Sequence, residues 1–301
     1  MRVLIAGASG LVGTALAAAL RAEGHMVSPM VRSGGNAQQG SVGWDPSKGT
    51  ADLAAMEGAD AAACLSGASI GERRWSPERK KLLRTSRVDA TNVFVDSLGK
   101  LSRKPRVFIC ASAVGIYGDR GDEMLTESSA PGSDFLSSLA RDWEAEAMRA
   151  EKAGIRTVNA RFGVILSPLG GALPRMLLPF KLGAGGRLGS GKQWMSWVAL
   201  VDVVNILLFA LANEGVRGPV NLVAPTPVQN VEFTRVLAKV LRRPAIFPAP
   251  AFMLRLALGE MADALLLSSQ RAIPERLRAA GFEFRFLDLE EALSADLRGK
   301  N

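Results

Sequence analysis

A glycine-rich turn near the N-terminus constrains the fold of this chain more than any other feature. The stretch IAGASGLVGTAL at 5–16 places Gly7, Gly10 and Gly13 directly after an apolar run and at the start of a helical pattern. In such a turn the bare backbone can approach a pyrophosphate, which the free N–H groups and the positive end of the helix dipole then bind. The motif predicts a dinucleotide-binding strand–turn–helix unit; a glycine-rich turn without a ligand is the alternative.

Apolar runs alternate with helical patterns along the first half of the chain. The runs lie at 2–7, 25–31, 60–67, 106–112 and 155–163, and helix-like stretches lie at 11–23, 77–101 and 134–153. Runs without alternation of apolar and polar residues are typical of strands buried on both faces, and the β–α order predicts a parallel sheet. We therefore expect an α/β fold: a Rossmann-type doubly wound parallel sheet with a smaller, mostly helical C-terminal substrate lobe.

The second half of the chain predicts how the two parts divide. Residues 166–194 are rich in Gly and Pro, which favours a partly ordered long loop. A helix near 202–213, with Asp202 as its N-cap, and a strand at 218–224 precede a mostly helical tail from 230. We expect residues 1–163, together with about 195–224, to form the NAD(P)-binding domain, and residues 164–194 and 225–301 to form the substrate-side lobe.

The end of the second expected strand bears on which dinucleotide binds. An acidic residue there would accept a hydrogen bond from the ribose of NAD, whereas an arginine accommodates the 2′-phosphate of NADP. The chain has Arg32 and Ser33 at this point, and no Asp or Glu between Glu23 and Asp45. Because a guanidinium binds phosphate through charge-assisted hydrogen bonds, the sequence favours NADP over NAD. An arginine exposed on a turn is the alternative.

Charge and composition exclude several classes of function. The net charge is +8, but the densest basic patch, at 72–84, is interleaved with leucines at helical spacing. It is typical of a solvated helix face, with an anionic small-molecule ligand as the alternative, and no nucleic-acid motif occurs.

No apolar run reaches the length of a membrane span. The single histidine, His25, excludes His-based metal sites and Ser-His-Asp triads. Cys64 and Cys110 lie in apolar runs, so we expect them reduced and buried in a cytoplasmic protein.

Seven further stretches carry a family resemblance. They are LSGASI (65–70), RWSPERKKLLRTSRVDAT (74–91), SAVGIYG (112–118), FLSSLARDWEAEA (135–147), RFGVILSPLGGAL (161–173), GSGKQWMSWV (189–198) and VNLVAPTPVQN (220–230). With the GxxGxxG spacing, they resemble the extended short-chain dehydrogenase/reductase (SDR) superfamily over nearly the whole chain. Within it, the chain is similar to an atypical branch of NAD-dependent, sugar-nucleotide epimerase-like proteins that carry a C-terminal domain of unknown function.

The resemblance implies a set of cofactor-contacting residues. They are Gly7, Ser9, Gly10, Leu11, Val12, Gly13, Arg32, Ser33, Leu65, Ser66, Gly67, Ser112 and Arg161. Leu65, Ser66 and Gly67 lie where the superfamily's backbone passes the adenine-ribose and nicotinamide side of the cofactor. Ser112 falls at the position of the superfamily's active-site hydroxyl. Arg161 begins a loop that, in the superfamily, borders nicotinamide and substrate.

The chain departs from the superfamily at the catalytic pair. Extended members use a Tyr-x-x-x-Lys pair, in which the lysine lowers the pKa of the tyrosine for proton transfer. Here Leu136 and Ala140 fall at the positions of that pair, and Arg87 replaces an asparagine of the preceding helix. The only tyrosine, Tyr117, lies upstream, in a loop where the ring more often shapes the pocket than transfers protons.

Ser112, Tyr117 and Arg87 are therefore the candidate catalytic residues, and two functions stay open. One is an NADP-dependent oxidoreductase or epimerase acting on a small polar, sugar-like or nucleotide-linked substrate. In it, Ser112 would polarise a carbonyl, and Arg87 or a water would complete proton transfer. The other is a non-catalytic NADP(H)-binding sensor or assembly factor, which would keep the glycine turn and lack the proton donor.

Overall fold

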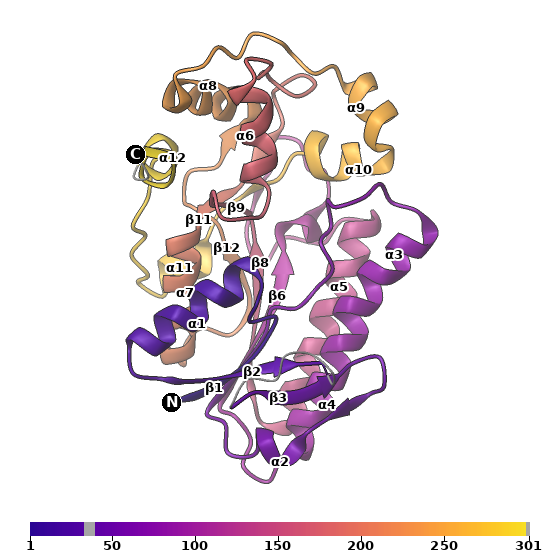
Figure 1. Ribbon diagram of the computed structural model, residues 1–301, viewed down its shortest axis with the longest axis vertical. Coiled ribbons are helices and arrows are strands. Elements are labelled where there is room, and N and C mark those ends of the chain that lie inside the picture. Colours follow the sequence, from indigo (N-terminus) through magenta and orange to yellow (C-terminus); the bar gives the residue numbers. More distant parts are fainter. Residues whose placement is uncertain (33–39, 299–301) are drawn as a thin grey trace.

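An eight-stranded sheet forms the centre of the structure, a computed structural model that describes residues 1–32 and 40–298 (Figure 1). Its strands, in spatial order, are β12 (Gly218–Leu222), β8 (Arg156–Phe162), β6 (Val107–Ala113), β5 (Ala61–Cys64), β1 (Arg2–Ala6), β2 (Met26–Val31), β3 (Val42–Asp45) and β4 (Thr50–Ala51). All neighbouring pairs are parallel except β3 and β4. The strands from β3 to β8 reproduce the 3-2-1-4-5-6 order of doubly wound dinucleotide-binding sheets. The predicted Rossmann-type α/β fold is confirmed.

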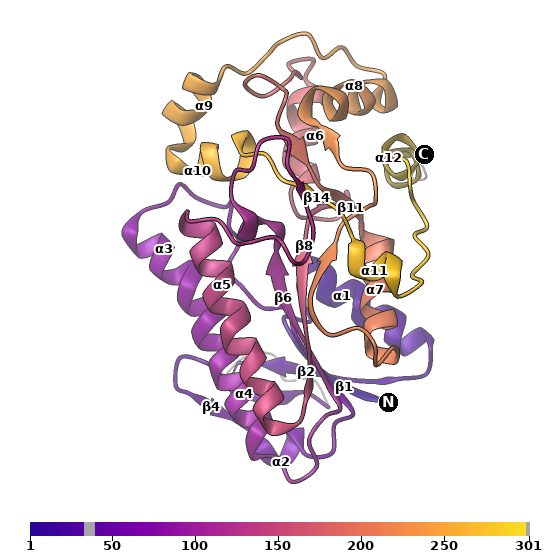
Figure 2. The same ribbon diagram turned by 180° about the vertical axis from the view of Figure 1, so that it is seen from behind.

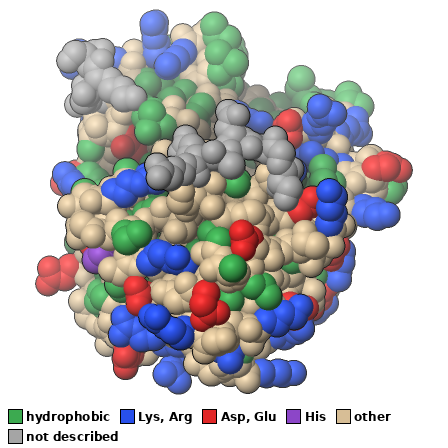
Figure 3. All heavy atoms as spheres, turned by 60° about the horizontal axis from the view of Figure 1, so that its bottom comes forward, with side chains coloured by type: hydrophobic (Ala, Val, Ile, Leu, Met, Phe, Trp, Pro, Cys, Tyr) green, Lys and Arg blue, Asp and Glu red, His purple; other side chains and the backbone are tan. Residues whose placement is uncertain are grey.

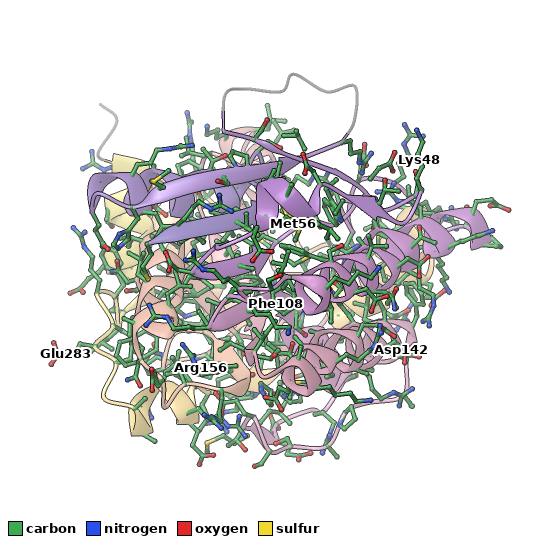
Figure 4. The ribbon with its side chains drawn as sticks, turned by 90° about the horizontal axis from the view of Figure 1, so that it is seen from below. Lys48, Met56, Phe108, Asp142, Arg156 and Glu283 are labelled. Carbon is green, nitrogen blue, oxygen red and sulfur yellow. The ribbon has the colours of Figure 1, made fainter. Side chains whose placement is uncertain are left out.

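Helices cover both faces of this sheet, as opposite views of the ribbon show (Figure 1, Figure 2). One face carries α2 (Leu53–Met56), α3 (Pro77–Arg84), α4 (Ala90–Lys100) and α5 (Phe135–Met148); the other carries α1 (Leu11–Ala22) and α7 (Leu200–Ala212). Strand side chains alternate between the two cores, so that Phe108 packs with α4 and α5 while Ile109 packs with α1 and α7. Seen from below, Phe108 and Met56 lie inside the fold, whereas Lys48 and Glu283 lie at its periphery (Figure 4).

A smaller lobe lies beyond the carboxyl ends of the strands (Figure 1). It contains α6 (Leu173–Lys181), α8 (Asn230–Leu241), α9 (Ala251–Leu258), α10 (Glu260–Ala262) and α12 (Leu289–Arg298), with the short strands β9 (Val164–Leu166), β10 (Trp194–Met195), β11 (Trp197–Ala199) and β13 (Val228–Gln229). Its core packs α6, α8 and α12 around the fully buried Trp197. The chain then returns to the sheet through β14 (Arg271–Ala272), which pairs with β7 (Met124–Leu125), and α11 (Glu275–Ala279), which packs on β12.

Three local features differ from the expectation drawn from the sequence. The N-cap of α7 is Ala199 rather than Asp202, whose carboxylate instead accepts the backbone N–H groups of Arg285 and Phe286 at 2.8 and 3.1 Å. Asp202 therefore fixes the segment before α12. Arg161 lies within β8 rather than in the loop after it, because the pairing of β8 with both neighbours extends to Phe162. Strands β3 and β4 escaped prediction because they are too short to show a periodic pattern.

Charges and cysteines are placed much as the sequence suggests. On the face shown in Figure 3, basic and acidic side chains are interspersed. Cys64 and Cys110 are register partners on β5 and β6, and both are buried and free. Within residues 1–32 and 40–298, no helix is both long and apolar enough to cross a membrane. The same residues contain no group of three His, Cys, Asp or Glu side chains placed to hold a metal ion.

Candidate functional site

The glycine turn joins β1 to α1 in a geometry that excludes side chains. Gly7 has a φ of 83°, and a Cβ there would lie 2.7 Å from the backbone carbonyl carbon of Leu65. A Cβ at Gly13 would lie 2.1 Å from the carbonyl oxygen of Gly7, so α1 packs directly on the turn. Gly10 is the N-cap of α1 without a side-chain hydrogen bond, and the first helical turn carries no acidic residue. The N-terminus of the helix is thus open to an anion, as pyrophosphate binding requires.

The loop after β5 lies against this turn. The backbone N–H of Leu65 donates to the carbonyl of Ala6 at 2.8 Å, which continues the pairing of β5 with β1. Leu65 and Ser66 are half-buried, and Gly67 is exposed; Ser9 is exposed in the turn itself. In doubly wound folds, ligands bind in the crevice where the strand order reverses, which here lies between β1 and β5. The predicted cofactor-contacting backbone therefore surrounds that crevice.

The remaining predicted cofactor residues near the turn have different surroundings. Leu11 lies beside Gly171 of the smaller lobe, and Val12 packs into the core that α1 and α7 share, so their side chains hold the turn in place. Arg32 is exposed directly after β2, where it is free to reach a 2′-phosphate. Ser33 lies outside the described residues. Cofactor contacts at these positions stay a prediction.

A row of polar side chains crosses three strands at the carboxyl end of the sheet. Ser112 of β6, Arg161 of β8 and Asn221 of β12 are register partners, which places their side chains on one face. Glu144 of α5 joins the row: its carboxylate accepts the Ser112 hydroxyl at 2.6 Å and the Nε and Nη2 groups of Arg161 at 2.8 Å each. Ser112 is 2% exposed, and the side chains of Arg161 and Glu144 are 8% and 11% exposed. The buried, bidentate ion pair between Arg161 and Glu144 thus fixes the orientation of the Ser112 hydroxyl.

All three nitrogens of the Arg161 guanidinium donate to protein groups, through four hydrogen bonds. Besides Glu144, its Nη1 donates to the Tyr117 hydroxyl at 2.9 Å and to the backbone carbonyl of Glu127 at 3.2 Å. Burial by itself lowers the pKa of Arg161, but the hydrogen bonds and charge of Glu144 outweigh it, so the pKa is raised and the side chain stays protonated. Arg161 therefore points into the fold. Its predicted role beside nicotinamide stays a prediction.

Tyr117 is completely buried in the 3₁₀ turn Val114–Tyr117 that follows β6. Its hydroxyl donates to Oδ1 of Asn221 at 2.7 Å and accepts from Arg161. Burial raises the pKa of Tyr117 even though the Arg161 charge opposes this. The shift is the reverse of the one that a lysine gives a proton-transferring tyrosine. These surroundings favour a role in shaping the site.

Arg87 lies in the π-helical turn Thr85–Asp89, beside the loop after β5. Its Nη2 donates to the Ala68 carbonyl at 2.9 Å, and its guanidinium lies 5.3 Å from the centre of the Trp143 ring. A Cβ at Gly67 would lie 3.1 Å from its Cζ. Burial lowers the pKa of Arg87 to about 10, with a contribution from the charge of Arg79. Arg87 is thus a desolvated cation next to the predicted cofactor-side loop.

Sequence reasoning missed Glu144 and Asn221, although one signal for Glu144 was present. On α5 it lies four residues after Ala140 and eight after Leu136, so all three share one helix face. That face turns toward β6, since Leu136 contacts Gly115 and Glu144 contacts Ser112. Asn221 gave no such signal, because its neighbours in β12 are apolar.

The fold and the site together define a class of protein. A glycine turn at the strand-order reversal, a serine at the carboxyl end of β6 and an additional parallel strand after β8 are features of the NAD(P)-binding Rossmann fold of SDR-like proteins. Residues 3–223 match the model of the NAD dependent epimerase/dehydratase family, and residues 249–295 match a domain of unknown function, DUF1731. The chain belongs to the NAD-dependent epimerase/dehydratase family.

Individual relatives resemble the chain over its whole length. The epimerase family protein ML0860 of Mycobacterium leprae is 43% identical over 293 residues, which cover 97% of this chain and 94% of that protein. The crystal structure of the human epimerase family protein SDR39U1 with NADPH superposes with a TM-score of 0.89 at 33% identity, covering 99% of both chains. A nucleoside-diphosphate sugar epimerase from Corynebacterium glutamicum superposes with a TM-score of 0.82 at 36% identity, covering 99% of this chain and 58% of that one.

Proposed function

We propose that the protein is an NADP(H)-dependent oxidoreductase or epimerase acting on a small polar, sugar-like or nucleotide-linked substrate. The observation that carries this proposal is the glycine turn packed against Leu65 at the reversal of strand order, with Ser112 at the carboxyl end of the neighbouring strand β6. Arg32 after β2 supports NADP over NAD, and so does the NADPH in the human relative's structure.

The fold supplies a place for each part of the cofactor. The glycine turn and the open N-terminus of α1 would hold the pyrophosphate, and Arg32 would pair with the 2′-phosphate. The bound nicotinamide would supply or accept the hydride. The substrate would reach it from the smaller lobe, which we propose as the substrate side.

In this proposal Ser112 would orient a substrate hydroxyl. Its single proton goes to Glu144, so the lone pairs of its oxygen are what remain for a ligand. It would therefore accept a hydrogen bond from a substrate alcohol, rather than polarise a carbonyl as the sequence suggested. Arg161 keeps Glu144 ionised and in position, and Tyr117 holds Arg161. Glu144, Arg161 and Tyr117 would thus contribute by fixing the orientation of the Ser112 hydroxyl.

A non-catalytic NADP(H)-binding protein is the second candidate. It is favoured by the hydroxyl groups of Ser112 and Tyr117, both of which are buried and engaged with protein partners. In this reading the network is a rigid support for the cofactor site and performs no chemistry.

Isothermal titration with NADPH and NADH tests the cofactor. The wild-type protein should bind NADPH more tightly, and Arg32→Ala should remove most of that preference. A hydrogen bond to a charged group contributes about 1.5–3 kcal/mol, which corresponds to roughly a tenfold to hundredfold change in affinity. Arg21→Ala, which removes an exposed arginine from the end of α1, is the matched control and should leave the preference intact. Equal affinity of the wild-type protein for both cofactors would refute the NADP assignment.

Turnover separates the two candidate functions. NADPH- or NADP-loaded protein is mixed with sugar nucleotides and with small hydroxylated acids, and the nicotinamide absorbance and the products are followed. An enzyme should lose on the order of a hundredfold in rate on Ser112→Ala, the usual effect of removing one oriented hydrogen bond at the reacting group. A binding protein should show unchanged NADPH affinity and no turnover in either form.

A further inference from the structure

Four consecutive backbone carbonyls, those of residues 68–71, each accept a hydrogen bond from a side chain. The donors, in order, are Arg87, Arg79, Trp75 and Arg175. These side chains come from the π-turn, from α3 and the segment before it, and from α6 of the smaller lobe. The loop that continues from the predicted cofactor-side residues Leu65–Gly67 is therefore ringed by three guanidinium groups from separate parts of the fold.

The positive charge of these guanidinium groups is poorly compensated. The side chains of Arg87 and Arg175 donate hydrogen bonds only to carbonyls and to one serine hydroxyl, and within the described residues neither forms an ion pair with a carboxylate. Arg79 has one acidic partner, Glu72, at 3.0 Å, and that carboxylate is about half exposed. A carbonyl dipole does not neutralise a charge, and the largely buried charges of Arg79 and Arg87 are costly unless they are paired, whereas Arg175 is exposed to solvent.

One donor of the group has no partner at all. Nε of Arg79 is buried and forms no hydrogen bond. Because the Arg79 side chain is only 12% exposed, solvent does not readily supply the missing acceptor. Arg79 also repels Arg87, because the two charges lie close enough for the pKa of Arg87 to fall, in addition to the larger effect of burial. The guanidinium groups of Arg79 and Arg87 repel each other, and Nε of Arg79 lacks a hydrogen-bond acceptor. An anion bound between them would relieve both, through charge-assisted hydrogen bonds.

We propose that Arg79, Arg87 and Arg175 form a binding site for an anionic group, phosphate or carboxylate, of the substrate. The inference rests on the proposed function and names its substrate class. The site adjoins Gly67, where a Cβ would lie 3.1 Å from Cζ of Arg87, and is separate from the glycine turn that would hold the cofactor's pyrophosphate. Arg175 reaches it from the smaller lobe, so an anion here would tie the two parts together. The basic patch at 72–84 is then a ligand site at one edge as well as a solvated helix face.

Inorganic pyrophosphate is the probe for this site. Isothermal titration is performed on the full chain saturated with NADPH, so that the glycine turn is occupied, and again without NADPH. The wild-type protein should bind one pyrophosphate when it is saturated with NADPH, and without NADPH it should bind pyrophosphate at this site and also at the open glycine turn. Arg79→Gln and Arg175→Gln should each weaken that binding about tenfold or more, because each removes a hydrogen bond between charged groups. The control Arg73→Gln removes an exposed charge from the same loop and should change the affinity less than about twofold.

Three outcomes would overturn the site. They are an absence of pyrophosphate binding, equal effects of Arg79→Gln and Arg73→Gln, and the loss of all pyrophosphate binding when NADPH is present, which would place the anion at the cofactor's own position. NADPH affinity is measured in each variant and should stay unchanged. If the wild-type protein failed to bind NADPH, the proposed function would fall, while the titrations without NADPH would still decide on the anion site.

Discussion

The ion pair between Glu144 and Arg161 offers a direct test of the buried network. The substitution Glu144→Gln keeps the shape of the side chain but removes its charge. It leaves the Arg161 guanidinium, 8% exposed, without a counter-ion. Breaking a buried ion pair in this way costs about 3–5 kcal/mol of unfolding free energy. With an unfolding entropy of roughly 2.1 cal/mol/K per residue over 301 residues, the melting temperature should fall by about 5–8 °C.

The matched control lies two residues further along the same helix. Glu146 pairs with Arg149 at 2.7 Å, but these side chains are 26% and 38% exposed. Ion pairs at the surface contribute about 0–1 kcal/mol, so Glu146→Gln should lower the melting temperature by no more than about 2 °C. Differential scanning calorimetry, with urea unfolding as a second measure, compares the two variants. Equal losses in both would show that Glu144 and Arg161 are not a desolvated pair, and the description of the site would be wrong.

Two other substitutions test the groups around this pair. Tyr117→Phe should cost about 1–3 kcal/mol, because Asn221 and Arg161 each lose a buried partner. It should leave NADPH affinity within twofold, and a turnover loss of two to four orders of magnitude would instead identify Tyr117 as the proton donor. Glu127 tests the pH dependence: burial raises its pKa above the ordinary value of 4.5, so the folded protein binds its proton more tightly than the unfolded chain does. Unfolding free energy should therefore fall as pH rises from about 4.5 through the raised pKa. Glu127→Gln should become more stable relative to wild type over that range, and a difference independent of pH, measured by urea titration at several pH values, would contradict this.

The cofactor half of the fold could be predicted because each of its signals is local. Gly7 and Gly13 stand where a Cβ would strike backbone atoms, and such a constraint is visible in sequence as an unreplaceable glycine spacing. The strands β1, β5 and β6 are buried on both faces, so they appear as apolar runs. The position of Arg32 at the end of β2 could be predicted for the same reason, because the end of a strand is a local feature of the sequence. Short edge strands such as β3 and β4 lack any such signal.

The polar network could be predicted only in part, because it depends on partners far apart in the chain. Ser112 was found from its position at the carboxyl end of a strand, but its partner Glu144 lies 32 residues further on, and Asn221 lies 104 residues from Tyr117. Helix spacing places Glu144, and not Glu146, on the same face as Leu136 and Ala140, but only the packing of α5 on β6 shows that this face is the buried one. Asp202 was misassigned for a similar reason: its partners, Arg285 and Phe286, arrive from a distant segment.

The distribution of positive charge decides what kind of chemistry the site suits. In the superfamily that the chain resembles, a lysine cation activates a tyrosine; here the corresponding face of α5 presents Leu136 and Ala140, and the nearest cation, Arg161, is already neutralised by Glu144. Burial raises the pKa of Tyr117, and the charge of Arg161, which lowers it, does not outweigh the burial. Three arginines whose single carboxylate partner among the described residues is Glu72 instead surround the loop at 68–71. Such a site is better suited to holding an anionic substrate by its charge and its hydroxyl than to protonating a carbonyl, so hydroxylated phosphates and carboxylates are the substrates to try first.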